Sequence, residues 1–181
     1  MKRLRTLSSL LVGALTILAG KTAFAEGSAK SAAKGFHLEM GPQLLIPTDG
    51  GPMGGGLDVE ARYGIGISDH FVIGPGARAS GYIISSQAVA LLTPVVRLSF
   101  PIGPVGPYLF GGGGFGFRGR LKDVVGEDDD YRNKGLALLG GAGLMIHLGP
   151  ILGVGAEASY ETILKTDFKV FALKPMIEFF F

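Results

Sequence analysis

The residue types that could carry out acyl-transfer chemistry are a nucleophile beside a base, with the base oriented by a third group. The chain offers three histidines as bases, His37, His70 and His147, and it contains no cysteine. No serine lies two or three positions from His37 or His147, and Ser68 flanks His70 only in a short turn-like stretch. The sequence therefore predicts no catalytic residues, and we expect that the protein is not an enzyme and uses no cofactor.

A run of acids is the stretch that could bind a divalent cation. Asp128, Asp129 and Asp130 follow Glu127 within a charged segment at 118–134. Calcium loops alternate their ligands around a central glycine, and this run does not. Charge runs are usually solvated loops, so we expect no metal site and retain the three aspartates only as weak candidates.

Ten other charged residues alternate with apolar neighbours, which places them on one face of extended strands. They are Glu39, Asp58, Glu60, Arg62, Arg78, Arg97, Glu157, Glu161, Lys174 and Glu178. Because unpaired buried charges are costly, we expect these residues to form an ion-pair network inside a closed sheet. The simplest role for these residues is to stabilise the fold.

Eight strand-like runs supply that sheet. They cover residues 36–46, 57–68, 71–83, 88–100, 105–117, 135–147, 152–164 and 168–181. The second run alternates most clearly, with Val59, Ala61 and Tyr63 on one face and Glu60 and Arg62 on the other. The facing of the fifth run is ambiguous because of its four consecutive glycines. Eight antiparallel strands predict an all-β, up-and-down barrel.

The first 25 residues predict a cleavable signal peptide. Lys2, Arg3 and Arg5 precede an apolar run at 7–19, and Ala23-Phe24-Ala25 supplies an A-x-A cleavage site. Cleavage before Glu26 leaves 156 of the 181 residues. We expect export through the Sec pathway, a flexible periplasmic tail at 26–35 and one barrel domain at 36–181.

The leader also explains the mild basicity of the chain. It holds four of the 17 lysines and arginines and no acid, which leaves 13 basic against 15 acidic residues. The net charge of −2 gives no nucleic-acid footprint. An exported chain without cysteine has no disulfides, so closure of the fold or a lipid bilayer must stabilise it.

A soluble barrel such as a lipocalin would show the same alternation with inverted facing. Three features favour the membrane barrel. The polar faces are poor in Lys and Glu and rich in Gly and Ser, the chain ends inside a strand on Phe181, and the connections alternate between longer and tighter. The odd-numbered connections are the longer or more charged ones, apart from the brief last. Phe36, Phe71, Phe100 and Phe179 should join Phe181 in an aromatic girdle at one end.

Residues 36–181 resemble the small eight-stranded outer-membrane barrels of the OmpA and OmpX type. The resemblance implies an integral protein of the bacterial outer membrane, monomeric and in contact with lipid and lipopolysaccharide. It also implies that Ile177, Phe179 and Phe181 act as the signal read by the barrel-assembly machinery. A structural or surface-interaction role follows. A narrow pore is the alternative, and a lipid A-modifying barrel enzyme is less favoured because such enzymes act near the outer leaflet, whereas all three histidines map to the periplasmic end.

Prolines are the main departure from a regular barrel. Pro42, Pro75, Pro94, Pro107 and Pro175 lie inside the runs, and each removes a ladder donor. All five fall on the outward face, so we expect lipid-facing bulges to accommodate them.

Overall fold

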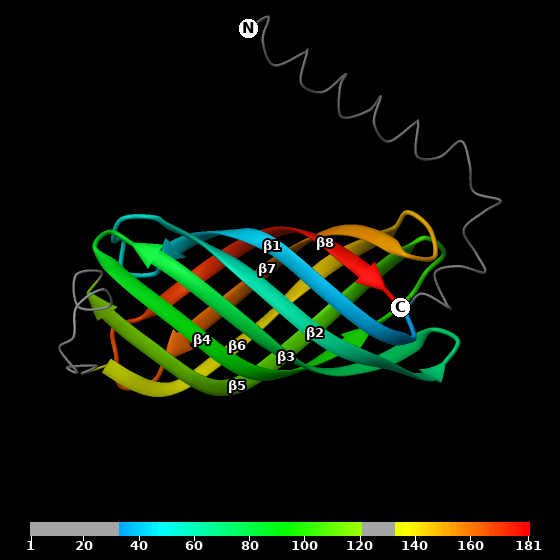
Figure 1. Cartoon of the computed structure of the whole chain (residues 1–181), viewed down its shortest axis with the longest axis horizontal. Coiled ribbons are helices and arrows are strands. Elements are labelled where there is room, and N and C mark those ends of the chain that lie inside the picture. Colours follow the sequence, from blue (N-terminus) through cyan, green and yellow to red (C-terminus); the bar gives the residue numbers. More distant parts are fainter. Residues whose placement is uncertain (1–32, 121–132) are drawn as a thin grey trace, which may run out of the picture.

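A computed structural model of the chain describes residues 33–120 and 133–181, and these residues form a closed all-β barrel. The strands are β1 Gly35–Pro47, β2 Gly54–Ser68, β3 Phe71–Ile84, β4 Gln87–Ser99, β5 Val105–Arg120, β6 Asn133–His147, β7 Leu152–Ile163 and β8 Lys169–Phe180. Each strand pairs antiparallel with the next, and β8 pairs with β1 (Figure 1). The predicted eight-stranded up-and-down topology is confirmed. No helix in these residues is long and apolar enough to cross a membrane.

The barrel begins slightly earlier than the sequence predicted. Gly35 already pairs with Gly64 of β2, one residue before the expected start at Phe36. Ala33 is buried, and its carbonyl oxygen lies where a Cβ on Gly64 would stand. Residues 33–35, expected as part of a free tail, therefore contact the barrel. The predicted signal peptide and the rest of the predicted tail fall outside the described residues.

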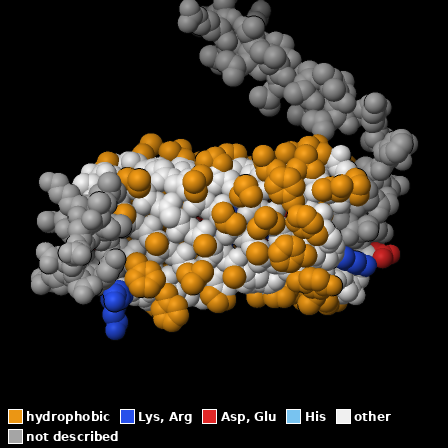
Figure 2. Space-filling view, in the orientation of Figure 1, with side chains coloured by type: hydrophobic (Ala, Val, Ile, Leu, Met, Phe, Trp, Pro, Cys, Tyr) orange, Lys and Arg blue, Asp and Glu red, His pale blue; other side chains and the backbone are white. Residues whose placement is uncertain are grey.

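The alternation of each strand sorts apolar side chains to the outside. Leu57 and Phe115 are 67% and 69% exposed, and apolar side chains cover the wall in Figure 2, with charges visible only near the two ends. This facing is that of a transmembrane barrel, since a soluble barrel would bury these groups. The ambiguous fifth run is also resolved, because Phe117 points outward while Tyr108 and Phe110 are buried inside.

The two ends of the barrel differ, and we name them the terminal end and the loop end. The terminal end carries the start of β1 and the end of β8, and Phe36 packs there on Phe181 with ring centroids 5.9 Å apart. Phe71 and Phe100 form a second pair at 5.4 Å on the same end. The loop end holds the connections 48–53, 85–86 and 164–168, together with the end of β5 and the start of β6.

The predicted alternation of connection lengths is weaker than expected. The third connection, at the loop end, consists only of Ser85 and Ser86, and is as short as the turn at 69–70. Ser85 has a φ of 56°, the left-handed conformation that two-residue hairpins favour. The tight turn thus replaces the longer outer loop that the sequence pattern indicated.

Four of the five prolines stand at ladder gaps without bulges, and Pro107 pairs with Leu144 in an uninterrupted ladder, so the expected accommodation by bulges was wrong. Pro42 of β1 and Pro175 of β8 occupy the same register, and pairing stops at 41–43 and then resumes unchanged. Pro75 and Pro94 stand at similar gaps in the β2–β3 and β4–β5 ladders. The register shift in the described ladders lies at Gly66/Ser68, not at a proline. The missing donors are absorbed as local gaps on the outer wall.

Candidate functional site in the lumen

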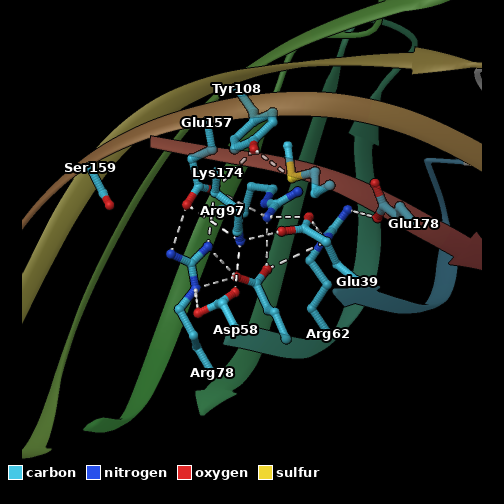
Figure 3. Close-up of polar contacts among 12 residues, drawn as sticks. Glu39, Asp58, Arg62, Arg78, Arg97, Tyr108, Glu157, Ser159, Lys174 and Glu178 are labelled. Atoms are coloured by element: carbon cyan, nitrogen blue, oxygen red, sulfur yellow. Dashed lines mark hydrogen bonds and ion pairs between the residues drawn. The ribbon is translucent and has the colours of Figure 1, made fainter. Parts of the chain in front are cut away.

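The structure places all ten predicted charged residues inside the barrel. Each is 7% exposed or less, and together they form what we call the charged layer, from the middle of the lumen toward the terminal end. Figure 3 labels eight of them, all but Glu60 and Glu161, and shows these eight side chains projecting from several strands toward one another. Strand alternation alone produces this convergence, because every second residue of a barrel strand points inward.

Lys174 joins three acids from three strands. Its Nζ donates to Glu39 Oε1 at 2.6 Å and to Asp58 Oδ1 at 2.7 Å, and it lies 3.5 Å from Glu157 Oε1. Ser80 donates to the second oxygen of Asp58 at 2.6 Å. The ammonium group is compact and its three donors can serve separate carboxylates, so one lysine links β1, β2, β7 and β8.

Arg78 makes the most regular contacts of the charged layer. Its Nε and Nη2 donate to Glu60 Oε2 at 2.9 and 2.7 Å. Its Nη1 and Nη2 donate to the two oxygens of Glu157 at 2.8 and 3.0 Å. The planar guanidinium thereby serves two carboxylates, in the forked geometry that gives strong charge-assisted hydrogen bonds.

Arg97 is held differently, between carboxylates and an aromatic face. Its Nη2 lies 2.7 Å from Glu39 Oε2 and 3.0 Å from Glu60 Oε1, as ion pairs whose N–H directions miss hydrogen-bond geometry. Its Cζ lies 4.0 Å from the ring centroid of Tyr108, and Arg78 sits 4.4 Å over Phe110. Cation–π contacts of this kind gain strength in desolvated sites.

Toward the terminal end, Arg62 and His37 share Glu178. Arg62 Nη2 donates to Glu178 Oε1, and His37 Nδ1 lies 2.8 Å from the same oxygen. Arg62 Nη1 also lies 3.4 Å from both Glu39 and Glu60, which joins this cluster to the rest of the charged layer. The ring of Phe180 packs between His37 and His147, with centroids 5.3 and 5.0 Å away.

Glu161 differs from the other acids of the charged layer because its hydrogen-bond donors are hydroxyl groups and not cations. Tyr82 donates to its Oε2 at 2.6 Å and Ser159 to its Oε1 at 3.1 Å. Glu161 is fully buried on the side of the lumen that faces the loop end. It therefore marks the border of the charged layer.

Beyond Glu161 the lumen is filled by apolar side chains, which we call the apolar plug. Its members are Leu45, Tyr82, Val89, Leu91, Ala137, Ile163, Phe168, Val170 and Ala172. The rings of Tyr82 and Phe168 stack with centroids 6.2 Å apart and planes at 12°. The short connection before β8 places Phe168, since Ile163 N donates to Phe168 O at 3.2 Å.

Sequence reasoning missed the apolar plug and the place of Tyr108 in the network. The signal for the plug was present, because Leu45, Val89, Val170 and Ala172 have the inward parity of their strands. Tyr108 lies on the fifth run, whose facing the sequence left open. Its hydroxyl donates to Glu157 Oε2 at 2.9 Å.

The histidines do not assemble a hydrolytic triad in the described part of the chain. His37 has a carboxylate partner, but no serine hydroxyl there hydrogen-bonds to a histidine ring; Ser68 Oγ instead accepts from the backbone of His70. Residues 33–119 and 134–181 also contain no group of three or more His, Asp or Glu that could hold a metal ion. The candidates Asp128, Asp129 and Asp130 lie outside the described residues.

The three residues expected to act as an assembly signal share the outer face of β8. Ile177 and Phe181 are 46% and 73% exposed, and Phe179 is half-buried beside them. Their position at the terminal end makes them accessible from the outside of the wall.

Comparisons with known proteins identify the fold. No protein family model matches the chain, and no curated protein matches it. Among solved structures, Neisserial surface protein A aligns over 82% of this chain and 98% of its own, with 16% identity and a TM-score of 0.67. Ail, the attachment invasion locus protein of Yersinia pestis, aligns over 82% and 99%, with 17% identity and a TM-score of 0.56.

The outer membrane enzyme PagL also aligns, over 77% of this chain and 97% of its own, with 14% identity and a TM-score of 0.57. One fold thus serves a surface protein, an attachment protein and an enzyme, so the fold alone does not decide the role. The chain has the fold of the small eight-stranded outer-membrane β-barrels.

Proposed function

We propose that the protein is an integral barrel of the bacterial outer membrane with a closed lumen and a structural or surface-interaction role. The apolar wall supports the location, because exposed apolar side chains on every strand require an apolar surrounding. The fold shared with outer-membrane proteins supports it too. In this membrane the terminal end faces the periplasm and the loop end faces outward, in contact with lipopolysaccharide.

The observation that carries the proposal is the double obstruction of the lumen. The charged layer crosses it with Arg78, Arg97 and Lys174, and the apolar plug fills it toward the loop end. A narrow eight-stranded barrel filled in this way supports a rigid anchor rather than a path for solutes.

Conductance measurement tests this role against the pore. Purified protein inserted into planar bilayers should give no discrete conductance steps, and liposomes that contain it should not swell in small sugars. An open barrel of a known porin serves as the positive control. Reproducible steps from the unaltered chain would replace the closed anchor by a pore.

Mass spectrometry of lipid A separates the anchor from an enzyme. Expression in a host should leave the lipid A spectrum unchanged, because the described histidines lie at the terminal end and lack a serine partner. A mass loss or gain that disappears in the His37→Ala variant would contradict the proposed role.

The last strand tests the route into the membrane. We expect Phe181→Asp to leave the chain in the periplasm, because the outer face of β8 loses its terminal aromatic group, whereas Phe181→Tyr should insert normally. Outer-membrane fractions analysed by heat-modifiable gel migration give the readout. Normal levels of folded Phe181→Asp barrel would show that Ile177, Phe179 and Phe181 are not an assembly signal.

A further inference from the structure

Most of the buried polar atoms without a protein partner, among the described residues, belong to side chains that line one cavity in the lumen. Among the described residues, the buried side-chain nitrogens and oxygens without a hydrogen bond belong to His37, Gln43, Arg97 and Glu178. Three of these four, all but Gln43, line one cavity at the terminal end. Burying such a group without a hydrogen-bond partner is costly. The cavity therefore calls for a ligand that satisfies them together.

The cavity has room for a very small ligand. It offers about 20 Å³ of space to the centres of water-sized molecules, and one water needs about 10–15 Å³ by this measure. Its lining runs from half-buried Ser99 and His147 at the rim to fully buried Arg97 and His37 inside. The cavity therefore lies between the terminal end and the charged layer.

The atoms without a partner include both hydrogen-bond donors and acceptors, and this identifies the ligand class. Arg97 presents Nε and Nη1 as donors, whereas Glu178 presents Oε2 as an acceptor. Nδ1 of His37 contacts Glu178, and its Nε2 is a further buried polar atom without a partner. An anion would meet the Glu178 carboxylate and a cation the Arg97 guanidinium, whereas water donates and accepts in turn.

We propose that this cavity is a water-binding site that hydrates the charged layer from the terminal end, while the apolar plug excludes water from the loop end. The barrel is then a half-channel, wet on one side and dry on the other. Water bridges Arg97, His37 and Glu178, and the stacked rings of Tyr82 and Phe168 end its path. This asymmetry is independent of any surface role of the loops.

Single cysteines test the asymmetry, because the chain has none of its own. Gly106→Cys places a thiol in the cavity, where an added Cβ meets only the His147 ring at 3.4 Å. Ala172→Cys places one in the apolar plug, where Ala172 is 1% exposed. The folded variants are treated with Ag⁺, and the thiols still free are counted with a fluorescent maleimide after unfolding. Ser85→Cys, in the exposed turn, is the positive control.

We expect Ag⁺ to react with the thiol of Gly106→Cys at least about tenfold faster than with the thiol of Ala172→Cys. The reason is that local opening at the cavity should require less free energy than opening of the apolar plug. Equal fast reaction would mean a lumen wet throughout, and equal slow reaction would mean a dry cavity; either result overturns the proposal. Adding Phe168→Ala should accelerate only the Ala172→Cys reaction.

Water-to-protein magnetisation transfer by NMR examines the unaltered chain. The Arg97 Nε–H signal should receive magnetisation from water faster than the Tyr82 hydroxyl, which is held by Glu161 beside the apolar plug. Faster transfer to the Tyr82 hydroxyl would contradict the half-channel even if a cysteine variant failed to fold.

Discussion

The charged layer and the apolar plug fill the same barrel by opposite means. The charged layer satisfies buried charges through mutual contacts, so its stability depends on complete sets of partners such as Arg78 with Glu60 and Glu157. The apolar plug contains few polar atoms and depends on packed volume, as in the Tyr82–Phe168 stack. The difference shows that a narrow lumen can be closed by a cooperative network or by ordinary core packing. The two regions should therefore respond differently to substitution.

The largest effect should come from removing the centre of the network. Arg78→Met leaves Glu60 and Glu157 without their main cation, and breaking a buried pair costs about 3–5 kcal/mol. Urea titration of the barrel in lipid vesicles measures the free energy of unfolding. Adding Glu60→Gln and Glu157→Gln should recover most of the loss. If the triple variant is no more stable than Arg78→Met alone, the network is not a coupled unit.

A truncation in the apolar plug should cost less and should not couple to the charges. Phe168→Ala removes a ring at the mouth of the plug, and we expect a loss of about 3 kcal/mol, near the lower limit for such changes. The variant should still give no conductance, because the charged layer remains. Discrete steps from Phe168→Ala alone would show that the plug is the sole barrier.

An isosteric exchange on β4 compares the two regions directly. Val89→Thr inserts a hydroxyl among apolar neighbours and should cost about 1–3 kcal/mol. Thr93→Val removes a hydroxyl whose hydrogen bond to Arg78 O is long, at 3.5 Å, and should cost less than about 1 kcal/mol. The same urea titration compares the losses of unfolding free energy in the two variants. A larger loss for Thr93→Val than for Val89→Thr would contradict the distinction between the two regions.

The smallest effect should come from the border residue. Glu161→Gln keeps one acceptor oxygen for Tyr82, and its amide nitrogen can donate to the Ser159 hydroxyl, so we expect a change below about 1 kcal/mol. Glu157→Gln, which loses charge beside Arg78 and Lys174, is the matched control and should cost more. Equal costs for the two would place Glu161 inside the charge network rather than at its edge.

Much of the fold follows from alternation alone. The period of two placed Glu39, Arg62 and Lys174 on the inner face correctly, because each sits between residues of clear outward parity. The contacts among them could not be derived, since they depend on strand register and tilt, which bring Arg78 of β3 against Glu157 of β7. The facing of Tyr108 could not be derived for a different reason. The glycines of β5 carry no side chain, so the alternation that marks the two faces of a strand is lost there.

The gap at Pro42 and Pro175 has a consequence for how the barrel closes. The β1–β8 ladder consists of two separate stretches, His37–Met40 with Ile177–Phe180 and Leu44–Pro47 with Val170–Leu173. Both donors are missing at the same register, so neither strand can bridge the middle. The seam between the first and last strands is therefore held by two short ladders instead of one continuous ladder. Either ladder can hold the seam closed while the other opens, so we expect this seam to open in two steps.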